Sequence, residues 1–447
     1  MRTFSPREEA LDLLLAVLKE GAYSPLVLHA ALENSRADSR DRSLTTALVY
    51  GVLQRKLTLD YVLHALLGPG KKIEDWVRVL LWISIYQKLY MDRIPDHAVV
   101  NEAVNLAKRR GHQGIAGLVN GVLRRFLREG KPDLETIQPK LRRQSIRSSH
   151  PEWLLRLWSE QWSNAAALEI AEADNRAPQT SVRVNRRRTD VDGLIQKLSE
   201  EGIDATRGKL SADSLVLSNG NAAASSAFRR GFMTVQDQSS MLIADAVCMK
   251  PSLRLLDACA GPGGKTTHLA ERSDDQGDIT ALDLYPHKAE LIDRAAARLG
   301  LKSIATRACD AREASAVFQA ASFDRVLLDV PCSGLGVLRR KPEIRWRKSA
   351  DDLAALVRVQ RDILEATADL VCHGGLLIYS TCTINRDEND RQVEQFMERH
   401  PQFSWDDTLW ERLPRALAEK RVAPAMVQIM PQDYDTDGFF IAVLRRA

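Results

Sequence analysis

Two cysteines, fifty positions apart, are the residues of this sequence best suited to covalent chemistry. Cys332 follows the apolar run 323–330, and Cys382 follows the apolar run 375–381. Each run predicts a buried strand, so each thiol is expected at the carboxyl end of a strand. Ligands bind at that edge of an open α/β sheet, and two thiols delivered there by different strands predict covalent catalysis.

A glycine-rich loop between a predicted strand and a predicted helix indicates a ligand site. Residues 257–267 read Asp-Ala-Cys-Ala-Gly-Pro-Gly-Gly-Lys-Thr-Thr. Glycines let the backbone approach a ligand, and the following helix presents free amides. The loop is not a P-loop, because Cys259 stands where the first glycine is required. It is not a dinucleotide fingerprint either, because Thr266 replaces the third glycine.

Two aspartates at predicted strand ends extend this ligand site. Asp283 ends the strand after the loop, where a carboxylate can accept hydrogen bonds from ribose hydroxyls. Asp310 ends a third expected strand. Either aspartate could instead cap a helix. Together they fit an adenosine-bearing cofactor, and the missing pyrophosphate signature favours S-adenosylmethionine over a nicotinamide.

The hydrophobic periodicity predicts three domains. Residues 1–145 repeat apolar side chains at helical spacing and predict an all-helical domain, with a linker over 130–149. Residues 146–235 predict a small α+β module that includes a helix over 153–170. Residues 236–447 alternate strands and helices, as in an α/β Rossmann-like fold with a doubly wound sheet. The expected strands of this sheet cover 253–258, 278–284, 323–330, 375–381 and 438–444, with helices over 286–299 and 353–372.

Composition narrows the class of protein. The 447 residues are 45% hydrophobic and contain no apolar run long enough to span a bilayer, no signal-peptide pattern and no Cys-x-x-Cys pair. We therefore expect a cytoplasmic protein with free thiols and without a metal. Residues 1–150 carry 24 Lys and Arg against 16 Asp and Glu, whereas the remainder carries 39 against 43. Such an amino-terminal basic surplus is typical of a surface that meets phosphates, although solvated helix faces would look alike.

The motifs around these residues resemble a known family. Residues 259–265, 329–334 and 380–383 are similar, in type, order and spacing, to the signature motifs of RNA cytosine-5 methyltransferases. The amino-terminal helices, with Gly-Leu-Val-Asn-Gly-Val-Leu-Arg-Arg at 117–125, resemble the NusB-like RNA-binding domain. The combination is identified with the bacterial members that methylate 16S ribosomal RNA. The resemblance covers nearly the whole chain and is weakest over 150–235.

The resemblance implies roles for individual residues. Spacing alone does not decide which thiol attacks, but the resemblance implies that Cys382 is the nucleophile and that Cys332 helps to release the product. It places Asp329 near the methyl donor and the base. The residues that it assigns to the S-adenosylmethionine site are Cys259, Ala260, Gly261, Pro262, Gly263, Gly264, Lys265, Asp283, Asp310 and Asp329.

RNA contact is expected from two basic segments. One contains Arg124 and Arg125; the other follows the Cys332 loop and mixes positive charge with an aromatic ring, which suits holding an RNA strand. Its candidate residues are Arg339, Arg340, Arg345 and Trp346. A solvated basic loop is the simpler reading of that segment. We expect a monomer acting on 16S ribosomal RNA; a ribosome-assembly factor with a vestigial methyltransferase fold and a nicotinamide oxidoreductase are the alternatives.

Overall fold

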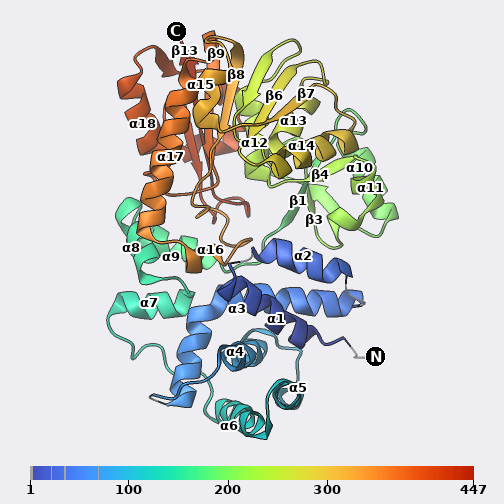
Figure 1. Cartoon of the computed structure of the whole chain (residues 1–447), viewed down its shortest axis with the longest axis vertical. Helices are drawn as coiled ribbons and strands as arrows, with labels where there is room; N and C mark the ends of the chain where they lie inside the picture. Colours follow the sequence, from blue (N-terminus) through green and yellow to red (C-terminus); the bar gives the residue numbers. More distant parts are fainter. Residues whose placement is uncertain (1–3, 22, 35–36, 69) are drawn as a thin grey trace. The chain divides into compact units, whose positions relative to one another are not determined.

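The chain folds into two compact units. Figure 1 shows the computed structural model, which describes residues 4–21, 23–34, 37–68 and 70–447. The helical unit comprises residues 1–176 together with 338–347, and the sheet unit comprises 177–337 together with 348–447. The small and the large sheet therefore lie in one unit, and the three-domain division stays a prediction. The segment 338–347 belongs to the helical unit although both its neighbours in sequence belong to the other.

Amphipathic helices build the helical unit, as the sequence predicted. Its helices are α1 (Pro6–Lys19), α2 (Ser24–Asn34), α3 (Ser39–Leu67), α4 (Asp75–Tyr90), α5 (Asp96–Arg110), α6 (Gln113–Glu129), α7 (Lys140–Ser148), α8 (Glu152–Gln161), α9 (Asn164–Ala173) and α16 (Ile344–Arg347). In α1 the buried side chains Ala10, Leu14 and Val17 recur at helical spacing. The carboxylate of Asp38 caps α3 by accepting from the Asp41 amide at 2.8 Å. Among the described helices, none combines the length and the apolar character needed to cross a membrane.

Two predicted elements of this unit differ in the structure. The helix expected over 153–170 is interrupted, because Ser163 accepts a hydrogen bond from the Ala166 amide at 3.1 Å and so starts α9 as a separate helix. The linker expected over 130–149 contains α7, which buries Ser145 and Ile146. Polar composition concealed this short helix, because only Ser145 and Ile146 of its nine residues are buried.

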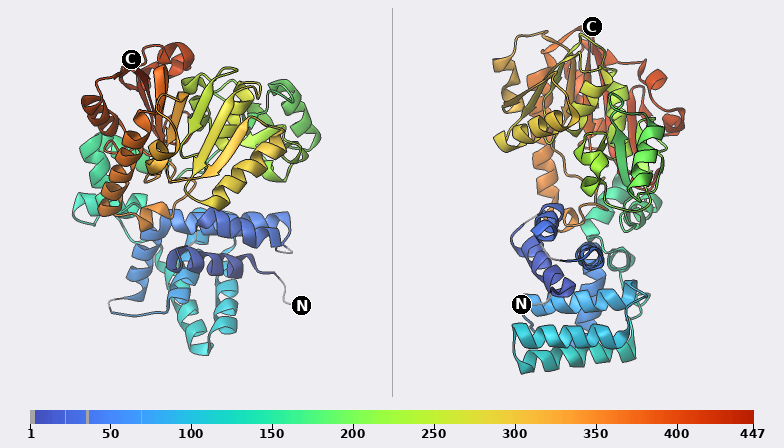
Figure 2. Two further views of the ribbon diagram at one scale, coloured as in Figure 1. Left: turned by 45° about the horizontal axis from the view of Figure 1, so that its top comes forward. Right: turned by 90° about the vertical axis from the view of Figure 1, so that its right-hand side faces the viewer.

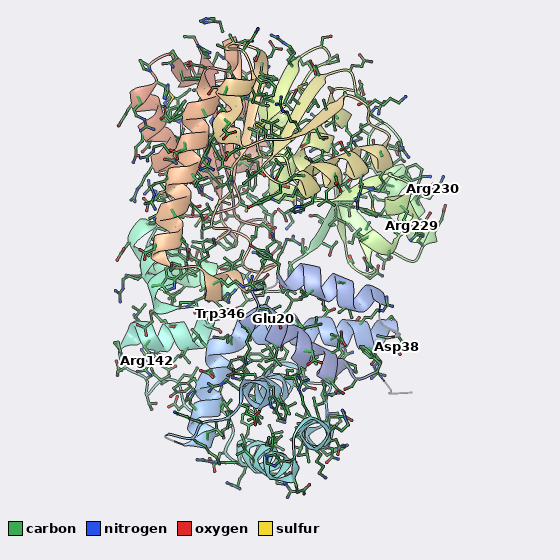
Figure 3. All side chains as sticks on the ribbon, viewed as in Figure 1. Glu20, Asp38, Arg142, Arg229, Arg230 and Trp346 are labelled. Atoms are coloured by element: carbon green, nitrogen blue, oxygen red, sulfur yellow. The ribbon has the colours of Figure 1, made fainter. Side chains whose placement is uncertain are left out.

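A small antiparallel sheet opens the sheet unit. Its strands lie in the order β2-β3-β1-β4, and α10 and α11 accompany them. The bounds are β1 (Thr180–Val184), α10 (Val191–Glu200), β2 (Ala205–Arg207), β3 (Ser214–Leu217), α11 (Ser226–Arg229) and β4 (Met233–Val235). Val182, Leu194 and Leu215 are fully buried between the sheet and α10. Arg229 and Arg230, at the end of α11, project from this part of the molecule (Figure 3).

The large sheet has the doubly wound order. Its strands run β11-β12-β13-β9-β8-β5-β6-β7, with β10 paired to β13. The bounds are β5 (Arg254–Asp257), β6 (Asp278–Asp283), β7 (Ile304–Ala308), β8 (Phe323–Asp329), β9 (Val371–Thr381), β10 (Phe403–Trp405), β11 (Arg421–Ala423), β12 (Met426–Ile429) and β13 (Phe439–Arg446). Strands β7, β6, β5, β8 and β9 are parallel, whereas β13 runs antiparallel to β9. The order reverses between β5 and β8, which is where α/β sheets bind ligands.

Both faces of this sheet are covered by helices (Figure 2). The helices are α12 (Gln238–Val247), α13 (Gly264–Arg272), α14 (Pro286–Leu299), α15 (Ala314–Val317), α17 (Ala350–Ala368), α18 (Asp390–Arg399) and α19 (Leu409–Arg412). Alternate residues of β9 serve opposite cores: Ile378 packs with α12, α13 and α14, whereas Tyr379 packs with α17 and α18. The helix predicted to reach 372 stops at Ala368, and Cys372 lies in β9 instead.

Candidate active site

The two thiols meet at the carboxyl edge of the large sheet. Cys332 lies three residues after the end of β8, and Cys382 directly follows β9. The strands are parallel neighbours in which Asp329 pairs with Ser380, so their carboxyl ends stop side by side. The two Sγ atoms are 3.3 Å apart. The sequence placed both thiols at this edge, and the register of β8 and β9 brings them into contact.

The surroundings of Cys332 favour its neutral form. The contact with the Cys382 thiol, burial and the negative charges of Glu388 and Asp329 raise the pKa of Cys332 well above its ordinary value. Asp329 is itself paired with a cation, because Lys265 Nζ lies 2.6 Å from Asp329 Oδ2. Cys332 therefore lies near the carboxylate of Glu388 and near the Lys265–Asp329 pair.

Lys265 and Asp329 form an ion pair beside the thiols. Burial disfavours the ammonium, but Asp329 and, more weakly, Cys382 raise the pKa of Lys265. The second oxygen of Asp329 accepts from Ser380 Oγ at 3.0 Å. Lys265 also lies over the ring of Phe439, 5.2 Å from its centre. The lysine that begins α13 in sequence thus has partners from β8 and β13 and is fixed in orientation.

The glycine loop links β5 to α13 and contacts the neighbouring strand β6. The amide of Ala260 donates to Leu282 O at 2.8 Å, and the amide of Gly261 donates to Asp283 Oδ2 at 3.1 Å. Gly263 has φ +100°, a left-handed conformation that favours glycine, and a side chain there would meet the backbone of Ile292 at 3.1 Å. The predicted cofactor loop is therefore closely packed onto β6 and α14.

Asp257, the last residue of β5, belongs to this site although the sequence pattern predicted no role for it. Its carboxylate is buried; Oδ2 accepts from Thr266 Oγ1 at 2.7 Å, while Oδ1 has no hydrogen-bond partner. Burial, with a smaller effect of Asp329, raises the pKa of Asp257 to about 7. A buried acceptor without a donor fits a ligand that brings a cation. The signal in sequence was a carboxylate at a strand end directly before the glycine loop.

The remaining predicted cofactor residues occupy different environments. Burial, followed by the charges of Asp257, Asp329 and Asp283, raises the pKa of the Cys259 thiol, which suits a packing residue better than a reactive one. Asp283 is buried at the end of β6 and joins the glycine loop to the Tyr285 amide, 3.0 Å away. Asp310 accepts from the Arg312 amide at 3.0 Å and pairs with the Arg312 guanidinium, so it caps the short helix that follows.

Much of the basic segment after the Cys332 loop, for which RNA contact was predicted, is packed within the helical unit. Arg345 is only 1% exposed, and its guanidinium donates to Ser149 O at 3.3 Å and to Asn175 Oδ1 at 3.2 Å. Arg339 is buried as well. The indole of Trp346, labelled in Figure 3, packs on the helical core and donates to Leu53 O at 2.8 Å. Arg345 and Trp346 hold the segment in the helical unit. The burial of Arg339 and Arg345 argues against RNA contact for these two, whereas contact through Arg340 and Trp346, which are partly exposed, stays a prediction.

The other predicted RNA contacts lie on α6. Arg124 is exposed and donates to Asn120 Oδ1 of its own helix at 3.2 Å. Arg125 is half-buried, pairs with Glu129 at 2.7 Å and donates to Leu66 O at 2.8 Å. Arg124 is thus available to a partner, whereas Arg125 also ties α6 to α3. Across the residues that the structure describes, no cluster of His, Cys, Asp and Glu has the composition of a metal site.

Comparisons with known proteins agree with this geometry. Residues 246–445 match the family model described as 16S rRNA methyltransferase RsmB/F, 5–128 match the NusB family, and 150–223 match the ferredoxin-like domain of RsmF/B-like methyltransferases. A protein of Bacillus subtilis named probable ribosomal RNA small subunit methyltransferase B is 42% identical over all of both chains. One of the same name from Synechocystis is 35% identical, over 99% of this chain and all of its own. The crystal structure of PH0851 has a TM-score of 0.84 and 25% identity, and the match covers all of both chains. The chain therefore belongs to the family of ribosomal RNA small subunit methyltransferases B.

Proposed function

We propose that this protein methylates carbon 5 of a cytosine in 16S ribosomal RNA, with S-adenosylmethionine as methyl donor and with a covalent cysteine–cytosine intermediate. The observation that carries the proposal is the pair of thiols 3.3 Å apart, beside Asp329 and Lys265, at the strand ends next to the glycine loop. Family membership supports ribosomal RNA as the substrate. The identity of the methylated nucleobase, cytosine, and of the methylated atom, carbon 5, is inferred from the two thiols.

Cytosine chemistry explains why a thiol is needed. Carbon 5 is a poor nucleophile until a thiolate adds to carbon 6, which makes the ring enamine-like. Carbon 5 would then take the methyl group from S-adenosylmethionine, whose sulfur–methyl bond breaks to leave S-adenosylhomocysteine. A base removes the carbon 5 proton, and elimination of the thiolate restores the aromatic ring and frees the enzyme. Two functions are required of the protein, nucleophile and proton handling, and two thiols lie in contact to share them.

We assign the nucleophile to Cys382 and product release to Cys332. The charge of a Cys382 thiolate helps to raise the pKa of Lys265. Because this attraction acts on both groups, the Lys265 ammonium in turn favours the thiolate of Cys382. The carboxylates of Glu388 and Asp329 disfavour a thiolate at Cys332. Electrostatics thus support the same assignment as the family resemblance. Asp329, three residues before Cys332, would contact the ring nitrogen and exocyclic amine and stabilise the adduct.

The cofactor site is assigned to the glycine loop and its neighbours. S-adenosylmethionine supplies an electrophilic methyl group and carries an ammonium group. Asp257 Oδ1, which is buried without a donor, fits that ammonium. The loop from Cys259 to Lys265 would line the cofactor, Asp283 would accept from the ribose, and Asp310 would lie near the adenine. Asp310 would have to exchange its pairing with Arg312 to do so.

The test is methyl transfer to RNA. The protein is incubated with methyl-labelled S-adenosylmethionine and unmodified small-subunit ribosomal RNA, free and in subunits, and the labelled base is mapped. We expect 5-methylcytosine with wild-type protein and none with Cys382→Ala. Label on another atom would overturn the proposal, and RNA binding without label on either substrate would favour an assembly factor.

A further inference from the structure

Glu388 joins the two loops that carry the thiols. It lies in the turn between β9 and α18 and is completely buried. Its Oε2 accepts from the Ser333 amide at 2.8 Å, and its Oε1 accepts from the Ser333 hydroxyl at 2.5 Å. Its Oε1 also accepts from Asn385 Nδ2 at 3.0 Å and from Thr383 Oγ1 at 3.4 Å. Ser333 directly follows Cys332, and Thr383 directly follows Cys382, so a single carboxylate holds both loops.

The peptide groups on both sides of Cys332 are fixed in this way. Gln360, from α17, donates from the same Nε2 to Pro331 O at 3.0 Å and to Glu388 Oε2 at 3.0 Å. The residue before the thiol is therefore held by Gln360, and the residue after it by Glu388. The Tyr379 hydroxyl donates to Glu388 O at 2.7 Å and fixes the glutamate in turn. Because both flanking peptide groups are held, the backbone of Cys332 has little freedom to move away from Cys382.

The cost of burying a carboxylate argues that Glu388 has a specific role. A buried charge is strongly unfavourable unless hydrogen bonds compensate it, and an apolar side chain could fill the same volume. The donors around Glu388 satisfy both oxygens, and bonds to a charged acceptor are stronger than neutral ones. Glu388 provides two things that an apolar side chain would not: a defined geometry at Ser333 and Thr383, and a negative charge beside Cys332.

We propose that Glu388 is a positioning residue for the two-thiol reaction, which fixes the Cys332 thiol against the Cys382 thiol through Ser333 and Thr383 without touching the substrate. This inference rests on the proposed function. Glu388 also contributes to keeping Cys332 neutral, together with Asp329 on β8 and Cys382 after β9, while Lys265 on α13 acts on Asp329 and Cys382. A neutral Cys332 does not compete with Cys382 for carbon 6 while the adduct forms, and it must lose its own proton before it can remove the proton from carbon 5.

The experiment is Glu388→Gln in the full-length protein, because glutamine keeps the shape but loses the charge and one acceptor oxygen. Its amide would face donors on Ser333 or Gln360. We expect kcat to fall about 10- to 100-fold without a rise in the KM for RNA or S-adenosylmethionine, because the misplaced thiol affects the reaction and not binding. Covalent enzyme–RNA complex should accumulate because release is slowed. The pH at which Cys332 is half-alkylated should fall by roughly 0.5–1 unit when the negative charge is removed.

Asp406→Asn is the matched control. Asp406 is also a fully buried carboxylate of the sheet unit, paired with Arg412 and Arg445 away from the thiols. The Asp406→Asn substitution should lower the free energy of unfolding. It should leave kcat, the amount of covalent enzyme–RNA complex and the pH dependence of Cys332 alkylation unchanged. An active wild type with an unchanged Glu388→Gln variant overturns the inference alone, whereas an inactive wild type overturns the proposed function. If Glu388→Gln does not fold, Ser333→Ala decides: the inference requires a reduced kcat without a rise in KM, and a wild-type kcat overturns it.

Discussion

Each thiol is followed in sequence by a buried glutamate that accepts hydrogen bonds from a serine, and the two glutamates lie in different units. After Cys382, Glu388 accepts from the amide and hydroxyl of Ser333 in the sheet unit. After Cys332, Glu343 accepts from the amide of Ser24 at 3.0 Å and from its hydroxyl at 2.7 Å, both in the helical unit. The same chemical device thus fixes one loop within the catalytic fold and fastens the other segment to a separate unit.

Under the assignment proposed above, neighbouring charge distinguishes the two cysteines. The contact with the Cys382 thiol and burial, followed by the charges of Glu388 and Asp329, raise the pKa of Cys332, whereas the charge of Cys382 helps to raise the pKa of Lys265. Variants of these residues should therefore separate anchoring from chemistry.

The largest effect is expected from the thiols themselves. Cys382→Ala should lower turnover by about 10³-fold or more, because no adduct forms. Cys332→Ala should also stop turnover but should form an enzyme–RNA complex that survives denaturing electrophoresis, because the adduct forms and is not released. Trapping of RNA by Cys382→Ala instead would exchange the two roles.

A smaller loss is expected when the cation is removed. Lys265→Met should lower kcat by about 10²-fold, because the thiolate of Cys382 and the charge on Asp329 lose their partner. The pH of half-maximal alkylation of Cys382 should rise, as followed by mass spectrometry of the labelled peptide. Lys250→Met, at an exposed lysine of the same unit, is the control and should behave as wild type. An unmoved Cys382 profile in Lys265→Met would remove the electrostatic distinction between the thiols.

The sequence predicted the parts of this site that follow from local pattern. Apolar runs identified β5, β6, β8 and β9, and the residues after them were expected at one edge of the sheet; the parallel register of β8 and β9 brings Cys332 and Cys382 together there. The family resemblance supplied the predictions that S-adenosylmethionine is the cofactor and that cytosine is the modified nucleobase. Both kinds of inference use residues that are near each other in sequence or have a recognisable spacing.

The anchors could not be predicted in this way. Glu388 and Ser333 are 55 positions apart, and Arg345 bonds to Ser149 and Asn175, 196 and 170 positions away. Charged side chains are ordinarily exposed, so the basic segment 339–347 was assigned to solvent and RNA. Its burial depends on carbonyl and carboxylate partners that only the folded helical unit brings together. Polarity in a sequence therefore identifies hydrogen-bonding capacity, and the partner that uses it is decided by the tertiary fold.

The contact of Glu343 with Ser24 is the helical anchor. The Glu343→Gln variant should test whether this anchor is independent of the reactivity of the thiols. Loss of the charged acceptor for Ser24 should lower the free energy of unfolding by about 2 kcal/mol and reduce the hydrogen-exchange protection of residues 343–347. The alkylation profile of Cys332 should stay at its wild-type pH, in contrast to Glu388→Gln. Glu20→Gln, at an exposed glutamate labelled in Figure 3, should change stability by no more than about 0.5 kcal/mol. A shifted Cys332 profile in Glu343→Gln would show that the two anchors act alike.

The smallest effect concerns a buried carboxylate beside the helical anchor. Burial raises the pKa of Asp174 to about 7, although Arg345 and Arg339 oppose the rise, and neither carboxylate oxygen has a hydrogen-bond partner. Between about pH 4 and pH 7 the unfolded chain has released this proton while the folded chain still binds it. The contribution of Asp174 to stability must therefore fall as pH rises through this window and stay low above it.

Asp174→Asn removes this pH dependence. We expect the variant to be more stable than wild type by about 1–2 kcal/mol at pH 8, because the buried amide offsets part of the gain, and to lose that advantage near pH 4. Urea unfolding at several pH values measures the difference. His150 Nε2 lies 3.5 Å from Asp174 Oδ2, and burial lowers the pKa of His150 well below its ordinary value, so the imidazole is neutral in both folded proteins near pH 8. A variant less stable than wild type at pH 8 would mean that the charge of Asp174 stabilises the anchor by attracting Arg345, and that the helical anchor, like the thiol site, depends on a buried charge pair.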